Sequence, residues 1–187
     1  MSDHDRLLSL LAERSARRGH FTLASGRQST LYIDARLTTM SPEGLALIGP
    51  LALTGLRDMA WDISAIGGLT LGADPVSYAI AYASASTDRP LRAFTVRKEP
   101  KAHGTGKLVE GPFRVGDRVA VIEDVITTGG SALRAVEAIR AAGGEVAGVL
   151  ALVDREEGGR ETLIAAGLPV LALTRASDII ARLAPIG

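Results

Sequence analysis

Short apolar runs alternate with longer segments of mixed polarity over most of this chain. The runs predict buried strands at residues 63–66, 91–96, 118–122, 146–153 and 169–173. Strands separated by helices are joined by right-handed crossovers and lie parallel to one another. The pattern therefore predicts an α/β fold with a doubly wound, mainly parallel central sheet. A length of 187 residues suits a single domain over 1–187.

Helix-start and helix-stop signals lie between these runs. Ser41 is a suitable N-cap and Pro42 a suitable first helical residue, which predicts a helix running toward Met59. A second helix is expected over 74–85, where Asp-Pro opens the segment. A third is expected after residue 131, ending at the Gly-Gly pair 143–144.

The first 33 residues follow a different pattern. Leucines at 7, 8, 10 and 11 have helical spacing, and the Arg-Arg-Gly sequence at 17–19 is typical of a helix end. Short β-prone runs at 21–23 and 31–33 then flank the turn-forming residues 25–27. An N-terminal helix followed by a hairpin-like element is expected.

Composition and charge exclude several classes of function. Lys and Arg number 21 and Asp and Glu number 21, so the basic field of a nucleic-acid-binding protein is absent. The longest uncharged stretches, 44–56 and 75–87, are shorter than the roughly 20 residues that span a membrane. With Cys at 0, disulfides, thiolate metal sites and cysteine nucleophiles are excluded. The first five residues lack the basic and apolar regions of a signal peptide. We expect a soluble cytoplasmic protein that binds neither nucleic acid nor membrane.

The strongest chemical pattern covers residues 119–131. A buried strand leads to Glu123 and Asp124, and a Thr/Gly/Ser loop then opens a helix. Loop amides, hydroxyls and a helix N-terminus form a cradle for phosphate, and paired carboxylates accept hydrogen bonds from sugar hydroxyls beside a hydrated Mg²⁺. The loop lacks the Gly-Lys-Ser/Thr ending of a Walker loop. The alternative is an ordinary strand-turn-helix with an acidic surface pair.

Three further segments carry candidate chemistry. Four potential cations, Arg97, Lys98, Lys101 and His103, lie at the start of the long polar segment 98–111 or directly before it. They form either a lid that closes over a polyanion or a solvated basic loop. Residues 67–74 form a Gly-rich loop that approaches a pyrophosphate or makes a structural turn. Arg155 follows the fourth predicted strand and either holds a carboxylate or uracil-type oxygens, or pairs with Glu156 or Glu157.

These motifs together resemble a known family. Residues 119–131 resemble the signature with which type I phosphoribosyltransferases bind 5-phosphoribosyl 1-pyrophosphate (PRPP). Residues 21–29 resemble the N-terminal segment of the orotate phosphoribosyltransferase family, and residues 97–104 resemble its mobile catalytic loop. The motifs stand in the family's order from about residue 21 to residue 155.

The resemblance implies a type I phosphoribosyltransferase fold and a Mg²⁺-dependent transfer of phosphoribose from PRPP to orotate. The products are orotidine 5′-phosphate and pyrophosphate, in de novo UMP synthesis. It implies a homodimer in which the basic loop of one subunit closes over the site of the other. Mg²⁺ is implied to bind through PRPP and water, without a direct protein ligand.

The resemblance also assigns roles to residues. Lys101 and His103 are implied as catalytic, and Thr127 and Arg155 as orotate-binding, with Tyr32 and Ile33 beside the base. The implied PRPP-binding residues are Arg97, Lys98, Lys101, His103, Glu123, Asp124, Val125, Ile126, Thr127, Thr128, Gly129, Gly130 and Ser131.

Two departures from the family pattern keep other functions open. Ala24 and Leu71 stand where many members have Lys, so both are left out of the expected site. A phosphoribosyltransferase for another base should lack the matched 21–29 segment and Arg155. A non-catalytic PRPP-binding regulator would typically add a DNA-binding domain, whereas the first 20 residues provide one helix.

Overall fold

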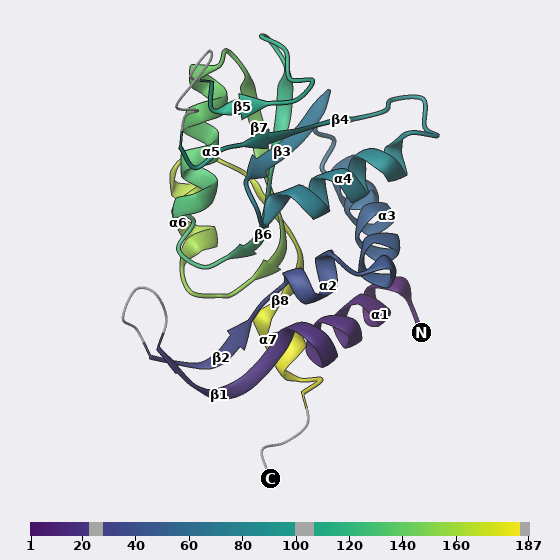
Figure 1. The fold of residues 1–187 in the computed structure, drawn as a ribbon, viewed down its shortest axis with the longest axis vertical. Coiled ribbons are helices and arrows are strands. Elements are labelled where there is room, and N and C mark those ends of the chain that lie inside the picture. Colours follow the sequence, from purple (N-terminus) through teal and green to yellow (C-terminus); the bar gives the residue numbers. More distant parts are fainter. Residues whose placement is uncertain (23–27, 100–106, 184–187) are drawn as a thin grey trace.

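A computed structural model describes residues 1–22, 28–99 and 107–183 of the chain. Within these residues the central sheet has six strands in the order β5-β4-β3-β6-β7-β8 (Figure 1). Neighbouring strands are parallel except for the antiparallel pair β4 and β5. The strands are β3 (Ala65–Leu69), β4 (Arg92–Val96), β5 (Val109–Glu110), β6 (Arg118–Ile126), β7 (Glu145–Asp154) and β8 (Val170–Arg175).

Helices cover both faces of this sheet. Figure 1 shows α3 (Pro42–Asp58) and α4 (Ala73–Ser84) on one side and α5 (Gly130–Ala141) and α6 (Gly159–Ala165) on the other. The expected doubly wound α/β architecture with a mainly parallel sheet is confirmed. Across residues 1–22, 28–99 and 107–183, no helix combines the length and hydropathy that crossing a membrane requires.

The alternation of side chains along β6 explains the two layers. Ala120 and Ile122 are fully buried in the cluster that contains α3 and α4 residues, whereas Val119 and Val121 are fully buried in the cluster that contains α5 residues. Successive side chains of a strand point to opposite faces, so a strand buried on both faces is apolar throughout. This is why β6 reads as a continuous apolar run in the sequence.

The N-terminal region partly differs from expectation. Helix α1 (Asp3–Leu10) continues into the π-helix η1 (Leu11–Ser15), and β1 (Ala16–Thr22) starts at once. The prediction that the helix extends through 17–19 is wrong, because Arg17 and Arg18 pair with Tyr32 and Leu31 of β2 (Gln28–Ile33). Cross-strand hydrogen bonds there outweigh the local preference for a helix end. The expected antiparallel hairpin is confirmed for the two strands, and its turn at 25–27 lies outside the described residues.

Other element bounds also shift. The strand predicted at 63–66 lies at Ala65–Leu69, and the strand predicted to end at residue 122 continues to Ile126, so the acidic pair lies within it. A Cβ on Gly68 would lie 1.9 Å from the carbonyl oxygen of Ile122, so glycine permits this close strand contact. The pattern also missed β5, α6 and the short helices α2 (Arg36–Thr39) and α7 (Ala176–Ile180).

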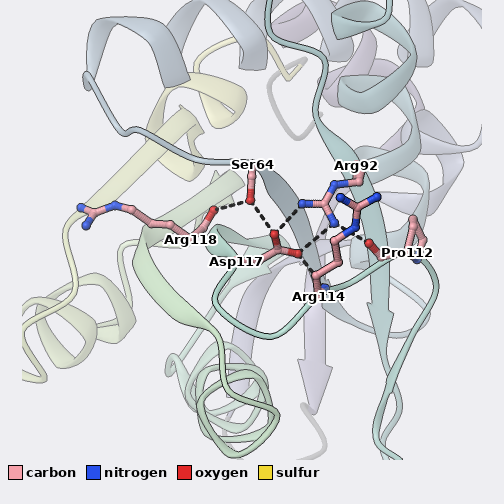
Figure 2. Close-up of polar contacts among 6 residues, drawn as sticks. All are labelled: Ser64, Arg92, Pro112, Arg114, Asp117 and Arg118. Carbon is pink, nitrogen blue, oxygen red and sulfur yellow. Dashed lines mark hydrogen bonds and ion pairs between the residues drawn. The ribbon is translucent and has the colours of Figure 1, made fainter.

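A cluster of polar side chains around Asp117 joins the start of β4 to the segment directly before β6 (Figure 2). The buried Asp117 carboxylate accepts hydrogen bonds from Ser64 Oγ at 2.9 Å, Arg92 Nη1 at 3.0 Å and the Arg114 backbone N–H at 2.7 Å. Arg92 Nη1 also donates to the Pro112 carbonyl oxygen at 2.6 Å. The cluster therefore ties the start of β4 and the chain after β5 to the start of β6.

We expect Asp117→Asn to lower the free energy of unfolding by about 2 to 3 kcal/mol at pH 7, because it leaves Arg92 without its carboxylate partner. Burial opposes ionisation of Asp117, but hydrogen bonds from Arg92, Arg114 and Ser64 hold its pKa below the ordinary 3.8. A lowered carboxyl pKa stabilises the protein above the ordinary pKa, and that contribution is lost as the pH falls through the folded-state pKa.

Urea unfolding at pH 7 and at pH 3 measures this difference. The gap between Asp117→Asn and the unsubstituted protein should shrink at the lower pH. Asp88→Asn, at an exposed position, is the matched control and should change stability by no more than about 0.5 kcal/mol. Equal stability of the Asp117 variant and the control at pH 7 would contradict the prediction.

Candidate functional site

A cavity of about 530 Å³ opens at the carboxyl edge of the sheet, where β3 and β6 lie side by side. The strand order changes direction at this point, and α/β sheets bind ligands in the crevice formed there. We call it the central cavity. It is lined by Tyr32, Ile33, Asp34, Ala35, Arg36, Leu69, Thr70, Leu71, Gly72, Lys98, Glu123, Asp124, Val125, Thr127, Thr128, Ser131 and Arg155.

A larger cavity, of about 660 Å³, lies near the amino ends of β3 and β4. It is lined by residues such as Trp61, Ile63 and Leu91, and by none of the predicted site residues. We assign the candidate site to the central cavity because the predicted phosphate loop and the carboxylates both line it.

The acidic pair lies at the centre of this cavity. Glu123 and Asp124 are both partly exposed, and Asp124 Oδ1 accepts a hydrogen bond from the Val125 N–H at 2.9 Å. The backbone of Gly72 approaches Asp124 so closely that a Cβ there would lie 2.5 Å from its carboxyl atoms. Gly72 thus allows the loop after β3 to pack against the Asp124 carboxylate.

The surroundings of the pair disfavour two negative charges. Burial, followed by the charge of Asp124, raises the pKa of Glu123 to about 8, and the charge of Arg134 opposes this. Burial also raises the pKa of Asp124, although hydrogen bonding by Val125 and the charge of Arg36 oppose it. Near neutral pH the pair therefore retains a proton on Glu123. The pair is suited to bind hydroxyl groups, which can donate to the ionised oxygens.

The predicted phosphate loop surrounds a small hollow of about 60 Å³ beside the pair. Gly129 has a φ of +82°, which favours glycine, and α5 begins at the next residue. A Cβ on Gly159 would lie 2.5 Å from the carbonyl oxygen of Thr127, so the first residue of α6 packs directly against the loop. Loop N–H groups and the helix N-terminus favour an anion in the hollow.

The residues expected to bind phosphate differ in which of their atoms a ligand could reach. Residues 127–131 all line the small hollow. Ile126 is 1% exposed and its side chain packs in the core, so only its backbone is available to a ligand. Val125 also packs against core side chains.

The loop after β3 is held by a single carboxylate. Asp74 accepts hydrogen bonds from Thr70 Oγ1 at 2.7 Å and from Thr95 Oγ1 at 2.8 Å. The peptide bond between Thr70 and Leu71 is cis. Leu71, which sequence analysis left out of the site, lines the central cavity and is 55% exposed.

Of the basic segment, the structure describes residues 97–99 at its start, and one of these lines the central cavity. Lys98 lines the central cavity, whereas Arg97 lines an adjacent hollow of about 630 Å³ that Lys98 also borders. Arg97 Nε donates to the Glu99 carbonyl oxygen at 3.3 Å. Lys101 and His103, the expected catalytic residues, lie outside the described residues, as does Ala24.

Arg155 also lines the central cavity and is 8% exposed. Its Nη2 donates to the Leu31 carbonyl oxygen at 3.1 Å and to Glu157 Oε1 at 2.6 Å. The expected ion pair with a neighbouring glutamate therefore exists, and Arg155 faces the cavity as well. Tyr32 and Ile33 line the cavity as expected.

Sequence analysis missed two charged residues of the cavity. Arg36 donates from Nε to Asp34 Oδ1 at 2.8 Å and from Nη2 to Asp34 Oδ2 at 2.9 Å, and both residues line the cavity. Hydrogen bonding by Arg36 lowers the pKa of Asp34. The available signal was their position directly after the apolar run 31–33.

The cavity has the donor set for a hydrated hard cation rather than for a dedicated metal cage. Carboxylate oxygens of Glu123 and Asp124 are suitable outer partners for Mg²⁺-bound water. Among the residues that the structure describes, no group of three or more His, Cys, Asp or Glu could hold a metal ion directly.

Comparisons with known proteins agree with one another. No family model matches the chain. The orotate phosphoribosyltransferase of Aquifex aeolicus is 46% identical over 183 residues, which covers 96% of this chain and 99% of that protein. The Mycobacterium tuberculosis orotate phosphoribosyltransferase in complex with Fe(III) dicitrate has a TM-score of 0.83 at 44% identity, covering 95% of this chain and 99% of that one.

The same M. tuberculosis enzyme in complex with PRPP has a TM-score of 0.80 at 42% identity and covers 95% of this chain and 99% of that one. Similarity of this extent holds for sequence and structure alike. The chain therefore belongs to the orotate phosphoribosyltransferase family and is a pentosyltransferase.

Proposed function

We propose that the central cavity carries out the Mg²⁺-dependent transfer of phosphoribose from PRPP to orotate. In this reaction N1 of orotate forms a bond to C1 of the ribose, the bond from C1 to pyrophosphate breaks, and the N1 proton is released. The observation that carries the proposal is that the Glu123-Asp124 pair, the phosphate loop and Arg155 all line one cavity. The M. tuberculosis relative bound to PRPP supports PRPP as the donor.

Different groups of the described residues bind different parts of PRPP. Glu123 and Asp124 accept hydrogen bonds from the two ribose hydroxyls, and residues 125–131 hold the 5′-phosphate through N–H groups and hydroxyls. Thr70, Leu71 and Gly72 lie beside the pyrophosphate. Contacts at both ends of the sugar fix C1 relative to the incoming base. The entropic cost of orienting the two reactants is then met when PRPP binds, which lowers the activation barrier of the transfer itself.

The departing pyrophosphate requires positive charge. Lys98 lines the central cavity and Arg97 lines the adjacent hollow, and the family resemblance adds Lys101 and His103 from the same loop. Mg²⁺, bound through PRPP and water, would neutralise charge that develops on the pyrophosphate oxygens. The ribose passes through an oxocarbenium-like state, so no nucleophilic side chain is needed.

The base occupies the end of the cavity near Arg155. Its guanidinium meets the orotate carboxylate or neighbouring oxygens, Thr127 adds a hydroxyl, and Tyr32 and Ile33 flank the ring. We further propose that the chain acts as one domain over 1–187 in the cytoplasm, as its length and composition suggest, and forms the homodimer with shared sites that the family resemblance implies.

A direct test incubates the protein with PRPP, Mg²⁺ and orotate, uracil, hypoxanthine or adenine, and measures nucleotide product. Orotate should be used at least about a hundredfold better than uracil, since only orotate offers a carboxylate to Arg155. Efficient use of a purine would support a phosphoribosyltransferase for another base. PRPP binding without product from any base would support a non-catalytic regulator.

Arg155→Lys should raise the KM for orotate about tenfold or more, with the KM for PRPP within about twofold of the unsubstituted value. Lysine retains the charge but cannot reproduce the paired hydrogen bonds of a guanidinium. Steady-state kinetics with each substrate varied in turn measures both constants. A loss of PRPP affinity with unchanged orotate KM would show that Arg155 serves the other substrate.

PRPP affinity should rise between about pH 7 and pH 8.5 at fixed free Mg²⁺. The raised pKa of Glu123, about 8, means that it is mostly protonated at pH 7, whereas ribose hydroxyls bind best to the ionised pair. Calorimetry in buffers of different ionisation enthalpy should detect a proton released when PRPP binds.

Glu123→Gln should flatten this pH dependence, because the titrating group is removed. Glu137→Gln, at an exposed position on α5, is the control and should retain it. An unchanged pH dependence in the Glu123 variant would assign the proton to another group.

A further inference from the structure

Glu157 lies behind Arg155, outside the central cavity. Arg155 lines that cavity and Glu157 does not, although their side chains are joined at 2.6 Å. Both are well buried, with 7% of the Arg155 side chain and 16% of the Glu157 side chain exposed. An ion pair this deep differs from the solvated surface pairs that contribute little to stability or geometry.

Among the residues that the structure describes, Arg155 Nη2 donates to acceptors in two different segments of the chain. One is the Leu31 carbonyl oxygen of β2, and the other is the Glu157 carboxylate. Because a guanidinium is planar and delocalised, two bonds to one terminal nitrogen restrict the plane of the whole group. Glu157, which does not line the central cavity, therefore restricts the orientation of Arg155, which does.

The backbone adopts an uncommon conformation to bring Glu157 there. Glu156 has a φ of +57°, in the left-handed region that residues other than glycine seldom adopt. Asp154 Oδ1 accepts from the Glu156 N–H at 2.8 Å, and Glu156 Oε2 accepts from the Ser177 N–H at 2.8 Å. These bonds stabilise a turn that directs the carboxylate of Glu157 to Arg155 and that of Glu156 to α7.

The base of the turn is also fixed. The Arg155 N–H donates to the Ile126 carbonyl oxygen at 3.0 Å, at the end of β6. The Arg155 backbone is thereby tied to the strand that carries the acidic pair, and its guanidinium is tied to Glu157. Both ends of a long, flexible side chain are held before any substrate arrives.

We propose that Glu157 is a positioning residue for the acceptor base, which holds the Arg155 guanidinium in the plane that an orotate carboxylate or ring oxygens require. This inference rests on the proposed role of Arg155 in orotate binding. The carboxylate of Glu157 also compensates the buried charge of Arg155 in the free protein. Binding of an anionic base then needs no rearrangement of Arg155.

The experiment compares Glu157→Ala with Glu157→Gln in the full-length protein. The alanine variant should raise the KM for orotate about tenfold, with the KM for PRPP within about twofold, because Arg155 loses its fixed plane. The glutamine variant retains an acceptor oxygen and should recover much of the loss, to within about threefold of the unsubstituted KM. A purely structural role would lower the melting temperature without this separation of the two constants.

Glu156→Gln is the matched control. It removes a charge from the neighbouring residue of the same turn, whose carboxylate contacts Ser177 rather than Arg155. Its orotate KM should stay within about twofold of the unsubstituted value. A larger rise would mean that any change in the turn affects orotate, which would overturn a specific role for Glu157.

Three results would overturn the inference. They are an unchanged orotate KM in Glu157→Ala, an equal rise in both KM values, and a fall in orotate KM, which would show that Glu157 competes with the substrate for Arg155. If the alanine variant does not fold, Glu157→Asp serves in its place, because it keeps the charge and withdraws it by one methylene. Orotate KM within about twofold in the aspartate variant would then overturn the inference.

Arg155→Lys separates this inference from the role of Arg155 itself. If Arg155→Lys leaves the orotate KM unchanged, the assignment of Arg155 to orotate is wrong. If Arg155→Lys raises the orotate KM and Glu157→Ala does not, only the positioning role of Glu157 is wrong.

Discussion

Gly72→Ala should weaken PRPP binding at least about tenfold and lower kcat/KM by about a hundredfold, although the new side chain is a single methyl group. The methyl carbon would lie 2.5 Å from the carboxyl atoms of Asp124, so the loop and the carboxylate must move apart. Gly72 has a φ of −62°, which alanine adopts readily, so the backbone itself does not resist the change. Titration calorimetry with PRPP and Mg²⁺, together with steady-state kinetics, measures the effect.

Gly55→Ala is the control for this substitution. It places a methyl group inside α3, where the nearest atom is the flexible end of Leu171 at 3.0 Å, and it should leave kinetics unchanged. Circular dichroism and thermal unfolding should show both variants folded.

A double variant tests the physical cause of the Gly72 effect. Asp124→Ala removes the carboxylate that the methyl group would displace, so Gly72→Ala should add little to an Asp124→Ala background. Full additivity of the two losses would show that Gly72 acts elsewhere in the loop. The same titration applied to Asp124→Asn should show weakened PRPP binding, since the amide keeps the shape of the carboxyl but loses its charge.

The sheet and its helices could be predicted because each buried strand is apolar on both faces. The run at 118–122 and the helix signals at Ser41 and Asp74 are local features, and the crossover rule converts them into a parallel sheet. The acidic pair and the phosphate loop were found for the same reason, because their residues are consecutive in the chain. The features that the sequence revealed are therefore local ones, although short elements such as β5 and α7 were missed.

Features formed between distant segments were not accessible. Nothing near Arg17 signals that β2 will convert a helix end into a strand. Gly72 and Asp124 are 52 positions apart in the sequence, and their contact depends on how β3 and β6 pair. The orientation of Glu157 rather than Glu156 toward Arg155 depends on a positive φ at a residue other than glycine. Tertiary context determines each of these, and each bears on the site.

The proposed dimer makes the basic loop and the acidic pair of one site belong to different chains. Leu37, Met40, Leu71, Tyr78 and Tyr82 have exposed apolar side chains, which are suited to contact with a second copy. In a two-fold dimer such an exchange is reciprocal, so each site would combine Asp124 and Arg155 of one chain with Lys101 and His103 of its partner. A variant at Lys101 and a variant at Asp124 would each inactivate both sites of its own homodimer.

Mixing Lys101→Ala chains with Asp124→Asn chains should restore activity to about a quarter of the unsubstituted level after subunit exchange. Random pairing makes half of the dimers mixed, and each mixed dimer has one site with both defects and one with neither. Each variant alone should stay nearly inactive, and chains with different tags confirm that exchange has occurred. If exchange is complete and activity does not recover, the basic loop serves the site of its own chain, because each site of a mixed dimer would then retain one defect.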